Sequence, residues 1–296
     1  MKDEKTEGAK KRRRSKSNSQ LSVAVRQFRR NKLAMIGLCV FIVVLLLCIF
    51  AEQLTPYDYA AIEPRNRFAP LSGEHPMGTD NLGRDLLTRL LKGGQISFLV
   101  AICSVVIGAA VGAALGCTAA YLGGWYEVII MRIVDILMSI PALLMATAIA
   151  TALGTGIFNS IIAISIASIA SLTRMIYSTA LTVKGQEYIR AARSYGASHL
   201  RCVFKYVLPN CAAPLIILAC MRFGTAITQI ASLSFLGLGV LPPTPEWGSI
   251  LNAGKSFIRE YPPIVIAPGI FIAIVMICVN FIGDGLRDAL DPKQKR

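Results

Sequence analysis

The stretch LAMIGLCVFIVVLLLCIFA, residues 33–51, carries no charged side chain. A helix of about 20 apolar residues crosses the roughly 30 Å hydrocarbon core of a bilayer. Only 16% of the 296 residues are charged, against about 25% in a typical soluble domain. Comparable apolar runs cover about 96–120, 133–153, 157–173, 211–236 and 263–283. The sequence therefore predicts an all-α integral membrane protein with six transmembrane helices.

The distribution of Lys and Arg predicts the orientation of these spans. Twelve basic residues precede the first span and six lie between the fourth and fifth, against five in the 52–92 loop and two in the 237–262 loop. The positive-inside rule therefore places both termini in the cytoplasm. The first run is too long for a signal peptide, and no A-x-A-like cleavage site follows it before EQLTPYDY. We therefore expect it to remain as a membrane anchor.

The net charge of +14 is concentrated in part in the N-terminal tail, which contains KKRRRSK. In isolation this run resembles a nucleic-acid patch, but beside a membrane span it favours attraction to anionic lipid, so no nucleic-acid partner is expected. Its flanking Ser, Asn and Gln residues predict disorder. We divide the chain into a basic tail (1–22), an N-terminal span with an extracytoplasmic loop (23–92), and a five-helix core (93–290) that contains a cytoplasmic loop (184–210).

Small residues recur every fourth position in the second span. This spacing places them on one narrow helix face, which lets another backbone approach closely. The face either joins a second chain or packs within its own bundle, and the second interpretation is preferred. Its members are Ser104, Gly108, Gly112, Gly116 and Ala120.

Few polar side chains fall inside the spans. Arg132 and Asp135 are three residues apart, so they can meet on one helix face near the inner boundary. Pro141 removes a backbone donor and predicts a kink, which is either a hinge or a fixed bend. Arg222 lies well inside the fifth span, where a charge costs about 2.5–3.5 kcal/mol. It either lines a translocation path, or pairs with a counter-ion or snorkels within the bundle.

The two outer loops contain no recognisable catalytic motif. The loop after the fifth span, GLGVLPPTPEWGSILNAGKSFIREYPP, is either a re-entrant scoop or an interfacial anchor in which Trp247 belongs to an aromatic belt. In GTDNLGRD, Gly78 and Gly83 have phosphate-loop spacing, but Arg84 and Asp85 replace the required Lys and Ser/Thr. A phosphate site is therefore not predicted there.

The cysteines and histidines do not form a metal-binding pattern. None of the eight cysteines lies in a large outer loop, no pair has C-x-x-C spacing, and His75 and His199 are far apart in the sequence. We therefore expect no disulfide, no metal site, no catalytic residue and no cofactor bound by this chain.

The inner loop contains YIRAARSYGASHLRCVFKYVLPN, residues 188–210, which is too short and too charged to span a membrane. Gly196 supplies a helix-ending position between two helical patterns, Ser198 can cap the second helix, and Pro209 is expected to end it. Such an elbow lies along the lipid surface or presents a helix to a partner. Its two expected apolar stripes are Tyr188, Ala191, Ala192 and Tyr195, opposite Arg190 and Arg193, and Leu200, Val203, Phe204 and Val207, opposite Arg201 and Lys205.

This elbow resembles the EAA loop of bacterial ABC importer permeases, whose pattern is E-A-A, three residues, G, nine residues, I-x-L-P. Two positions depart from the pattern, because Arg190 replaces the Glu and Tyr206 replaces the Ile. The blocks FRRNKLAMIG, HPMGTDNLGRDLLTRLLKGGQISF, RIVDILMSIPALL, SLSFLGLGVLPPTPEWG and GDGLRDALDP resemble the C-type subunit of the dipeptide, oligopeptide and nickel branch. The matching elbow positions are Ala191, Ala192, Gly196, Leu208 and Pro209, and Ala197 adjoins them.

The resemblance implies a non-catalytic subunit with a MetI-like permease core preceded by an extra N-terminal span. Its implied partners are a B-type permease, two cytoplasmic ATPases that bind ATP and Mg²⁺, and an extracytoplasmic solute-binding protein. The elbow would then be the coupling helix seated on one ATPase in the bacterial cytoplasmic membrane. Peptide is the expected substrate, with nickel or another small solute as the alternative.

Two other classes of protein fit the residues less well. A secondary transporter or channel working alone would be favoured by a Gly/Pro-broken inverted repeat or by buried carboxylates in several spans, and the sequence shows neither. A membrane enzyme would need a metal cluster, a nucleophile elbow or a phosphate loop, and none is recognisable.

Overall fold

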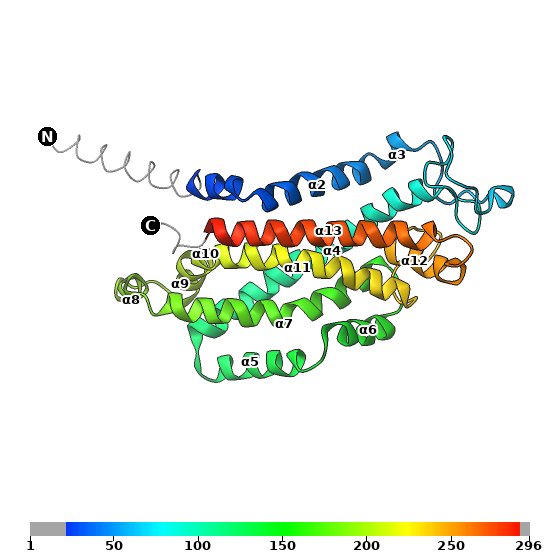
Figure 1. The fold of residues 1–296 in the computed structure, drawn as a ribbon. Coiled ribbons are helices and arrows are strands. Elements are labelled where there is room, and N and C mark those ends of the chain that lie inside the picture. The colour runs from blue at the N-terminus through cyan, green and yellow to red at the C-terminus, as the bar shows by residue number, and fades with distance from the viewer. Residues whose placement is uncertain (1–21, 291–296) are drawn as a thin grey trace.

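The computed structural model describes residues 22–290, which are mostly helical (Figure 1). The expected disorder of the tail therefore falls almost wholly outside the described residues. The predicted fold class is confirmed, because five helices are long and apolar enough to cross a membrane and a sixth candidate is a bent pair. The five are α2 (Lys32–Ile49), α4 (Leu86–Leu122), α7 (Ile157–Lys184), α11 (Ala212–Phe235) and α13 (Pro263–Leu290).

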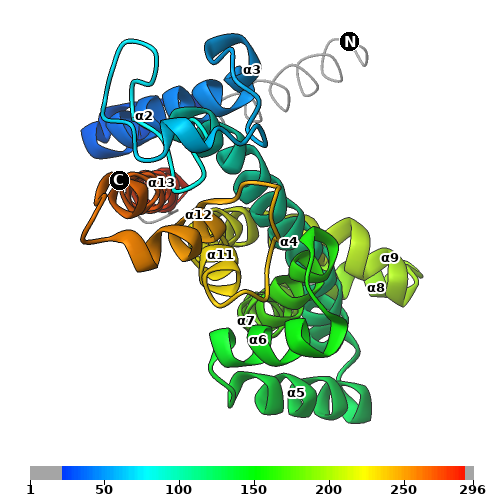
Figure 2. The same ribbon diagram turned by 90° about the vertical axis from the view of Figure 1, so that its right-hand side faces the viewer.

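The third expected span is a broken helix. It consists of α5 (Gly124–Met138) and α6 (Ala142–Leu153), which are bent by 93° relative to each other. The break lies at Pro141, whose ψ of 129° is extended, because proline lacks a backbone donor and disfavours helical geometry in the residue before it. Both views place the pair at the margin of the bundle, beyond α7 (Figures 1 and 2). The expected kink is thus a sharp turn, and the element begins earlier than position 133.

Two helices extend beyond the apolar runs that predicted them. The 37 residues of α4 make it about 55 Å long, well beyond the roughly 30 Å hydrocarbon core. It begins at Leu86 because the Asp85 side chain accepts a hydrogen bond from the Thr88 backbone N–H at 2.7 Å, which is an N-cap. The second long helix, α7, continues to Lys184, past the apolar run that ends at position 173. The regular helices therefore carry the chain out of the apolar layer.

The shorter elements gather at the two ends of the bundle (Figure 1). We call one end the elbow end, because it holds the elbow, the end of α13 and the helical residues 22–30 that precede α2. The opposite end, named the α12 end, holds α3, α12 and the loop from 55 to 85. The elbow elements are α8 (Glu187–Ser194), α9 (His199–Cys202), the π-helical η2 (Val203–Val207) and α10 (Leu208–Asn210); the others are α3 (Ala51–Leu54), η1 (Pro64–Asn66), α12 (Trp247–Gly254) and η3 (Lys255–Phe257).

The most extensive helix pair is α4 with α7, and the small face of α4 lies along it. A Cβ atom at Gly112 would lie 2.8 Å from the Cβ of Leu172, and one at Gly116 would lie 2.7 Å from the Thr173 carbonyl oxygen. Gly108 similarly faces Ser168. In this chain the face is therefore occupied by α7 and cannot at the same time hold a second subunit.

The described residues form three buried clusters, of which the smallest joins α5 to α7 through Met131, Val134 and Ala170. The largest one surrounds Trp247 and Phe98 and extends through α4, α7, α11 and α13. The second cluster lies at the elbow end and joins the elbow to α4 and α7. The elbow is therefore part of the packed bundle, with its own buried contacts.

Candidate functional site

The first half of the elbow ends in a Schellman turn. The Ala197 N–H donates to the Ala192 carbonyl at 3.1 Å, and the Gly196 N–H donates to the Arg193 carbonyl at 2.9 Å. Gly196 has φ of +79°, a left-handed conformation that glycine adopts without strain. No atom lies within 4 Å of the position that its Cβ would take. Glycine is thus needed here for backbone conformation and not for space within this chain.

The second half of the elbow runs directly into a spanning helix. The Ser198 side chain caps α9 by accepting from the Arg201 N–H at 3.3 Å. The backbone stays helical through η2 and α10 as far as Asn210, and the turn residue Cys211 separates α10 from α11, so the helix ends one residue after the expected Pro209. Pro209 lies in the first turn of α10, where a missing donor is tolerated, and the preceding π turn changes the bonding pattern. A single turn residue therefore joins the elbow to the spanning helix α11.

One face of the elbow is packed against the bundle. Its buried side chains contact α4 and α7 in the cluster that contains Cys117, Tyr121 and Ile176. Two further contacts join nearby residues to α4. Lys184 Nζ donates to the Ala120 carbonyl at 2.9 Å, and the rings of Tyr121 and His199 meet edge to face at 5.8 Å. The buried elbow residues are Ile189, Cys202, Val203, Val207 and Cys211.

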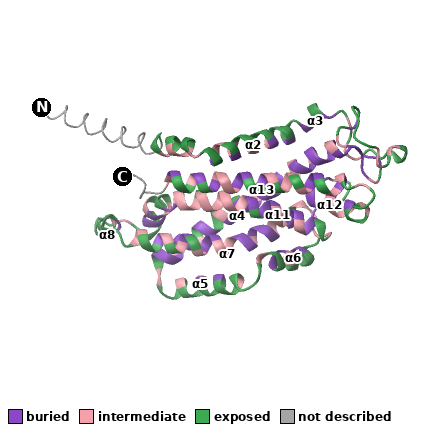
Figure 3. Cartoon of the chain, viewed as in Figure 1, coloured by how far each residue is buried: buried purple, intermediate pink, exposed green. Residues whose placement is uncertain are grey.

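The opposite face of the elbow is exposed and contains both aromatic and apolar residues (Figure 3). Tyr195 is 92% exposed, Leu200 67% and Phe204 54%. The expected stripe of Leu200, Val203, Phe204 and Val207 is therefore split, since only the two valines are buried. Four apolar residues in about two turns cover a wide arc, and the bundle contacts half of it.

The first expected stripe lies mostly on the exposed side of α8, so it can face lipid or a partner, as the sequence allowed. Ile189 is the buried residue of α8, whereas Tyr188 and Tyr195 are exposed and Ala192 is half-buried. Of the positions taken from the EAA pattern, Arg190, Ala191, Ala192, Gly196 and Ala197 lie together in α8 and its terminal turn, while Leu208 and Pro209 lie in α10 at the far end of the elbow. An α8 with so little burial can present these small residues to another molecule.

The intramembrane charges are arranged differently from the sequence expectation. Asp135 forms an ion pair with Arg174 of α7, and Arg132 is not its partner. Spacing of three along a helix makes a contact available, but here the packing of α5 on α7 supplies a better-placed cation. The Tyr177 hydroxyl also donates to Glu127 Oε1 across the same pair of helices. These two contacts attach α5 to the bundle.

Arg222 lies near the middle of α11 and is half-buried. No carboxylate among residues 22–290 forms an ion pair with it, so the counter-ion interpretation finds no partner in the described part of the chain. It lies eleven positions beyond Cys211, or about 16 Å along the helix axis. Within the described residues, Arg222 is thus a half-buried charge with no carboxylate partner in the apolar run of α11.

Residues 237–262, which follow α11, pack into the α12 end of the bundle, and we call this segment the scoop. Trp247 is fully buried and donates from Nε1 to the Leu90 carbonyl at 2.9 Å, so the aromatic-belt interpretation is wrong. Glu246 is fully buried too; its carboxylate accepts from Ser97 Oγ at 2.9 Å and from the backbone N–H groups of Gly248 and Ser249 at 2.9 and 3.1 Å. Burial raises the pKa of the Glu246 carboxyl, and these hydrogen bonds oppose that shift. The sequence analysis missed this group, although an acidic residue before a short helix is an N-cap signal.

The GTDNLGRD loop contains a second buried polar cluster that the sequence analysis also missed. Asp80 binds Arg84 Nε at 2.7 Å and lies 3.4 Å from Arg89 Nε. Asp85 lies 2.9 Å from His75 Nδ1 in addition to capping α4. The charged residues that excluded a phosphate loop therefore stabilise the loop itself at the start of α4.

A bundle of spanning helices with a packed elbow and an exposed elbow surface is the architecture of a membrane-embedded transport subunit. The chain belongs to the family described as binding-protein-dependent transport system inner membrane component, whose model matches residues 94–296. Residues 19–70 match the model described as the N-terminal TM domain of oligopeptide transport permease C. The resemblance to the C-type subunit is thereby confirmed.

Relatives and solved structures agree with this family. The chain is 42% identical to the dipeptide transport system permease protein DppC of Alkalihalophilus pseudofirmus, over 92% of this chain and 90% of that protein. It is 42% identical to the glutathione transport system permease protein GsiD of Escherichia coli, over 91% and 89%. Inward-facing MetNI methionine ABC transporter structures share its fold, with a TM-score of 0.53, 21% identity and coverage of 70% of this chain and 97% of that one.

Proposed function

We propose that this chain is the C-type permease subunit of an ATP-driven importer and that its elbow couples the bundle to a separate ATPase. The observation that carries the proposal is the division of the elbow into a buried face on α4 and α7 and an exposed face around Tyr195. In this proposal the chain itself is not catalytic and binds no cofactor. ATP and Mg²⁺ are bound by two cytoplasmic ATPases, and a B-type permease and a solute-binding protein complete the assembly.

The proposed orientation places the elbow end and both termini in the cytoplasm of a bacterium. Helical residues 22–30, the elbow and the end of α13 lie at the same end of the bundle (Figure 1). Arg26, Arg29 and Arg30 before the first span and the basic residues of the elbow lie at this end, and the positive-inside rule assigns the more basic side to the cytoplasm. The exposed surface of the elbow then faces the compartment that contains ATP.

The coupling requires the ATPase to bind the elbow with different free energies in its two states. The exposed small residues Ala191 and Gly196 allow close approach of another backbone, and Tyr195 supplies an anchor beside them. Because only Cys211 separates α10 from α11, a shift of the elbow is expected to move that spanning helix. The buried cluster at the elbow end extends the same shift to α4 and α7.

We propose a di- or oligopeptide as the substrate, with nickel or another small solute as the alternative. Support comes from the names of the two relatives, since a dipeptide and glutathione are both peptides. Uptake of labelled dipeptide, glutathione and Ni²⁺ by cells that contain the whole importer distinguishes these substrates. Arg222 is proposed to line the path, and unchanged uptake and assembly with Arg222→Leu would remove it from that role.

The test of coupling is site-specific crosslinking in native membranes. A photoreactive benzophenone residue at Tyr195 is expected to capture an ATPase subunit, and the same residue at the exposed Leu71 of the α12 end is the control. Recovery of phospholipid alone from position 195 would contradict the proposal. Uptake that persists without any ATPase would instead favour a transporter working alone.

A second test changes the elbow without changing its place in the membrane. Gly196→Asp introduces a side chain at φ of +79° on the exposed face and is expected to leave the protein in the membrane while abolishing uptake. Gly185→Asp adds the same charge at the end of α7, where φ is −68°, and is expected to retain uptake. Normal uptake by the Gly196 variant would show that this turn is not the contact.

A further inference from the structure

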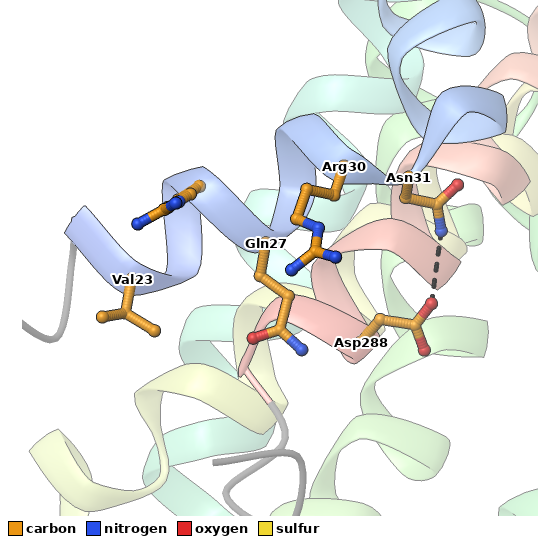
Figure 4. A pocket seen from close by; sticks show the side chains of 6 residues that line it. Val23, Gln27, Arg30, Asn31 and Asp288 are labelled. Atoms are coloured by element: carbon orange, nitrogen blue, oxygen red, sulfur yellow. Dashed lines mark hydrogen bonds between the residues drawn. The ribbon is translucent and has the colours of Figure 1, made fainter. Parts of the chain in front are cut away.

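A cavity of about 720 Å³ lies at the elbow end, between helical residues 22–30 and the end of α13 (Figure 4). This volume is in the range of sites that hold small ligands. None of the residues that line it belongs to the elbow or to the proposed path. They are Val23, Arg26, Gln27, Arg30, Asn31 and Asp288.

The walls of the cavity are fixed by contacts between the two helices. Asn31 interrupts the helix, caps α2 by accepting from the Ala34 N–H at 3.2 Å, and donates from Nδ2 to Asp288 Oδ2 at 3.2 Å. Phe28 packs against the backbone of α13, because a Cβ at Gly285 would lie 3.0 Å from its ring. Asn31 and Phe28 therefore attach the chain that precedes α2 to α13.

The cavity is lined by two cations, Arg26 and Arg30, and one anion, Asp288, so its lining carries a net positive charge. Positions 23, 26, 27 and 30 share one helix face, so Arg26 and Arg30 lie one turn apart and repel each other. Neither arginine forms an ion pair with a residue of the described 22–290 segment. Asp288 is hydrogen-bonded to Asn31 (Figure 4). A bound anion would relieve the repulsion between the two arginines.

The neighbouring parts of the sequence cannot supply that anion efficiently. Residues 1–21 contain eight Lys or Arg against three Asp or Glu, and residues 291–296 contain three against one. Both segments are therefore repelled by Arg26 and Arg30 on average. The anion that best fits the cavity comes from outside the chain.

Guanidinium groups bind phosphate oxygens through paired, charge-assisted hydrogen bonds. The cavity lies where α2 begins and α13 ends, which is the level of the lipid headgroups for helices that span the apolar layer. We propose that Arg26 and Arg30 bind the phosphate group of an anionic phospholipid at this level. Assignment of the site to the cytoplasmic leaflet rests on the orientation given under the proposed function, but the binding chemistry does not.

The test measures binding of fluorescent phosphatidylglycerol to the purified full-length chain in detergent, with phosphatidylcholine as the neutral comparison. The double variant Arg26→Gln/Arg30→Gln is expected to bind phosphatidylglycerol at least about tenfold more weakly, because charge-assisted bonds are lost. The matched control is Arg29→Gln/Lys32→Gln, which removes the same charge from neighbouring exposed positions that do not line the cavity. It is expected to change binding by less than about twofold, because neither side chain lines the cavity.

Three outcomes would overturn the proposal. If both double variants weaken phosphatidylglycerol binding equally, the binding is a general attraction of basic side chains for anionic lipid and not a specific site. Equal affinity of the native chain for phosphatidylcholine would show that the anionic headgroup is not recognised. Displacement of phosphatidylglycerol by inorganic phosphate at equal concentration would assign the cavity to a free anion instead of a lipid.

Thermal melting of each variant identifies loss of fold, and the singly substituted Arg26→Gln and Arg30→Gln chains then replace a double variant that melts early. The measurement needs neither ATPases nor uptake, so its failure is distinct from failure of the coupling proposal.

Discussion

Replacement of Glu246 by alanine is expected to release α12 from the bundle end. The substitution removes the acceptor of two buried backbone N–H groups, those of Gly248 and Ser249, and of the Ser97 hydroxyl. Loss of an N-cap costs about 0.5–2 kcal/mol, and each buried donor left unpaired costs about 1–3 kcal/mol. Removing a buried carboxyl offsets part of this cost. We expect a net loss of about 2 kcal/mol, confined to the scoop, which raises its local opening equilibrium about 30-fold.

Hydrogen–deuterium exchange of the α12 amides measures this opening directly. The Glu246→Ala chain should lose about 30-fold protection across 247–254, while amides of the α4–α7 pair stay protected. Glu246→Gln is the matched control, because its amide oxygen can accept from the same backbone groups and its NH₂ can donate to Ser97. Protection of α12 in the alanine variant equal to that of the native chain would refute the assignment of Glu246 as the group that holds the scoop.

Three further outcomes are expected. Gly112→Leu should overpack against α7 at a cost of about 1–3 kcal/mol and so lower the melting temperature of the purified chain. Ala110→Leu, on the exposed side of α4, is the control and should not lower it. Equal melting temperatures would contradict the close approach of α4 to α7 at Gly112. Asp135→Asn should destabilise by no more than about 1 kcal/mol, because the ion pair with Arg174 is roughly half exposed, and a larger loss in melting experiments would show that the pair is buried in the assembly. Since burial raises the pKa of Glu246, the native state holds its proton to higher pH than the unfolded state does. The protection of α12, corrected for intrinsic exchange, should be greatest below the unfolded pKa and fall as pH rises through the folded pKa; the same fall in Glu246→Gln would exclude this group as the cause.

The sequence predicts the parts of this structure that depend on local rules. Apolar runs locate the spans, and Gly196 and Ser198 locate the turn and the cap of the elbow, because backbone conformation and capping are decided within a few residues. The sequence does not predict which half of an apolar arc meets the bundle, so it left open that Val203 and Val207 are buried while Leu200 and Phe204 are exposed. It does not predict the 93° bend either, because Pro141 permits a break without setting its angle.

Contacts between distant segments account for the remaining differences. The partner of Asp135 is Arg174, which is 39 positions away and can be found only once α5 lies on α7. Trp247 has the composition of an interfacial anchor, yet it fills the space over Gly94, where a Cβ would lie 2.9 Å from its ring. The pairing of Glu246 with Ser97 likewise joins residues separated by 149 positions.

The length of α4 gives the two ends of the molecule a shared mechanical part. Its first turns touch the scoop through Leu90 and Ser97, and its last turns touch the elbow through Cys117 and Tyr121. No proline interrupts the rod between these contacts. Under the proposed coupling, a sideways displacement of α4 at the elbow end would reappear, with opposite sign, at the α12 end.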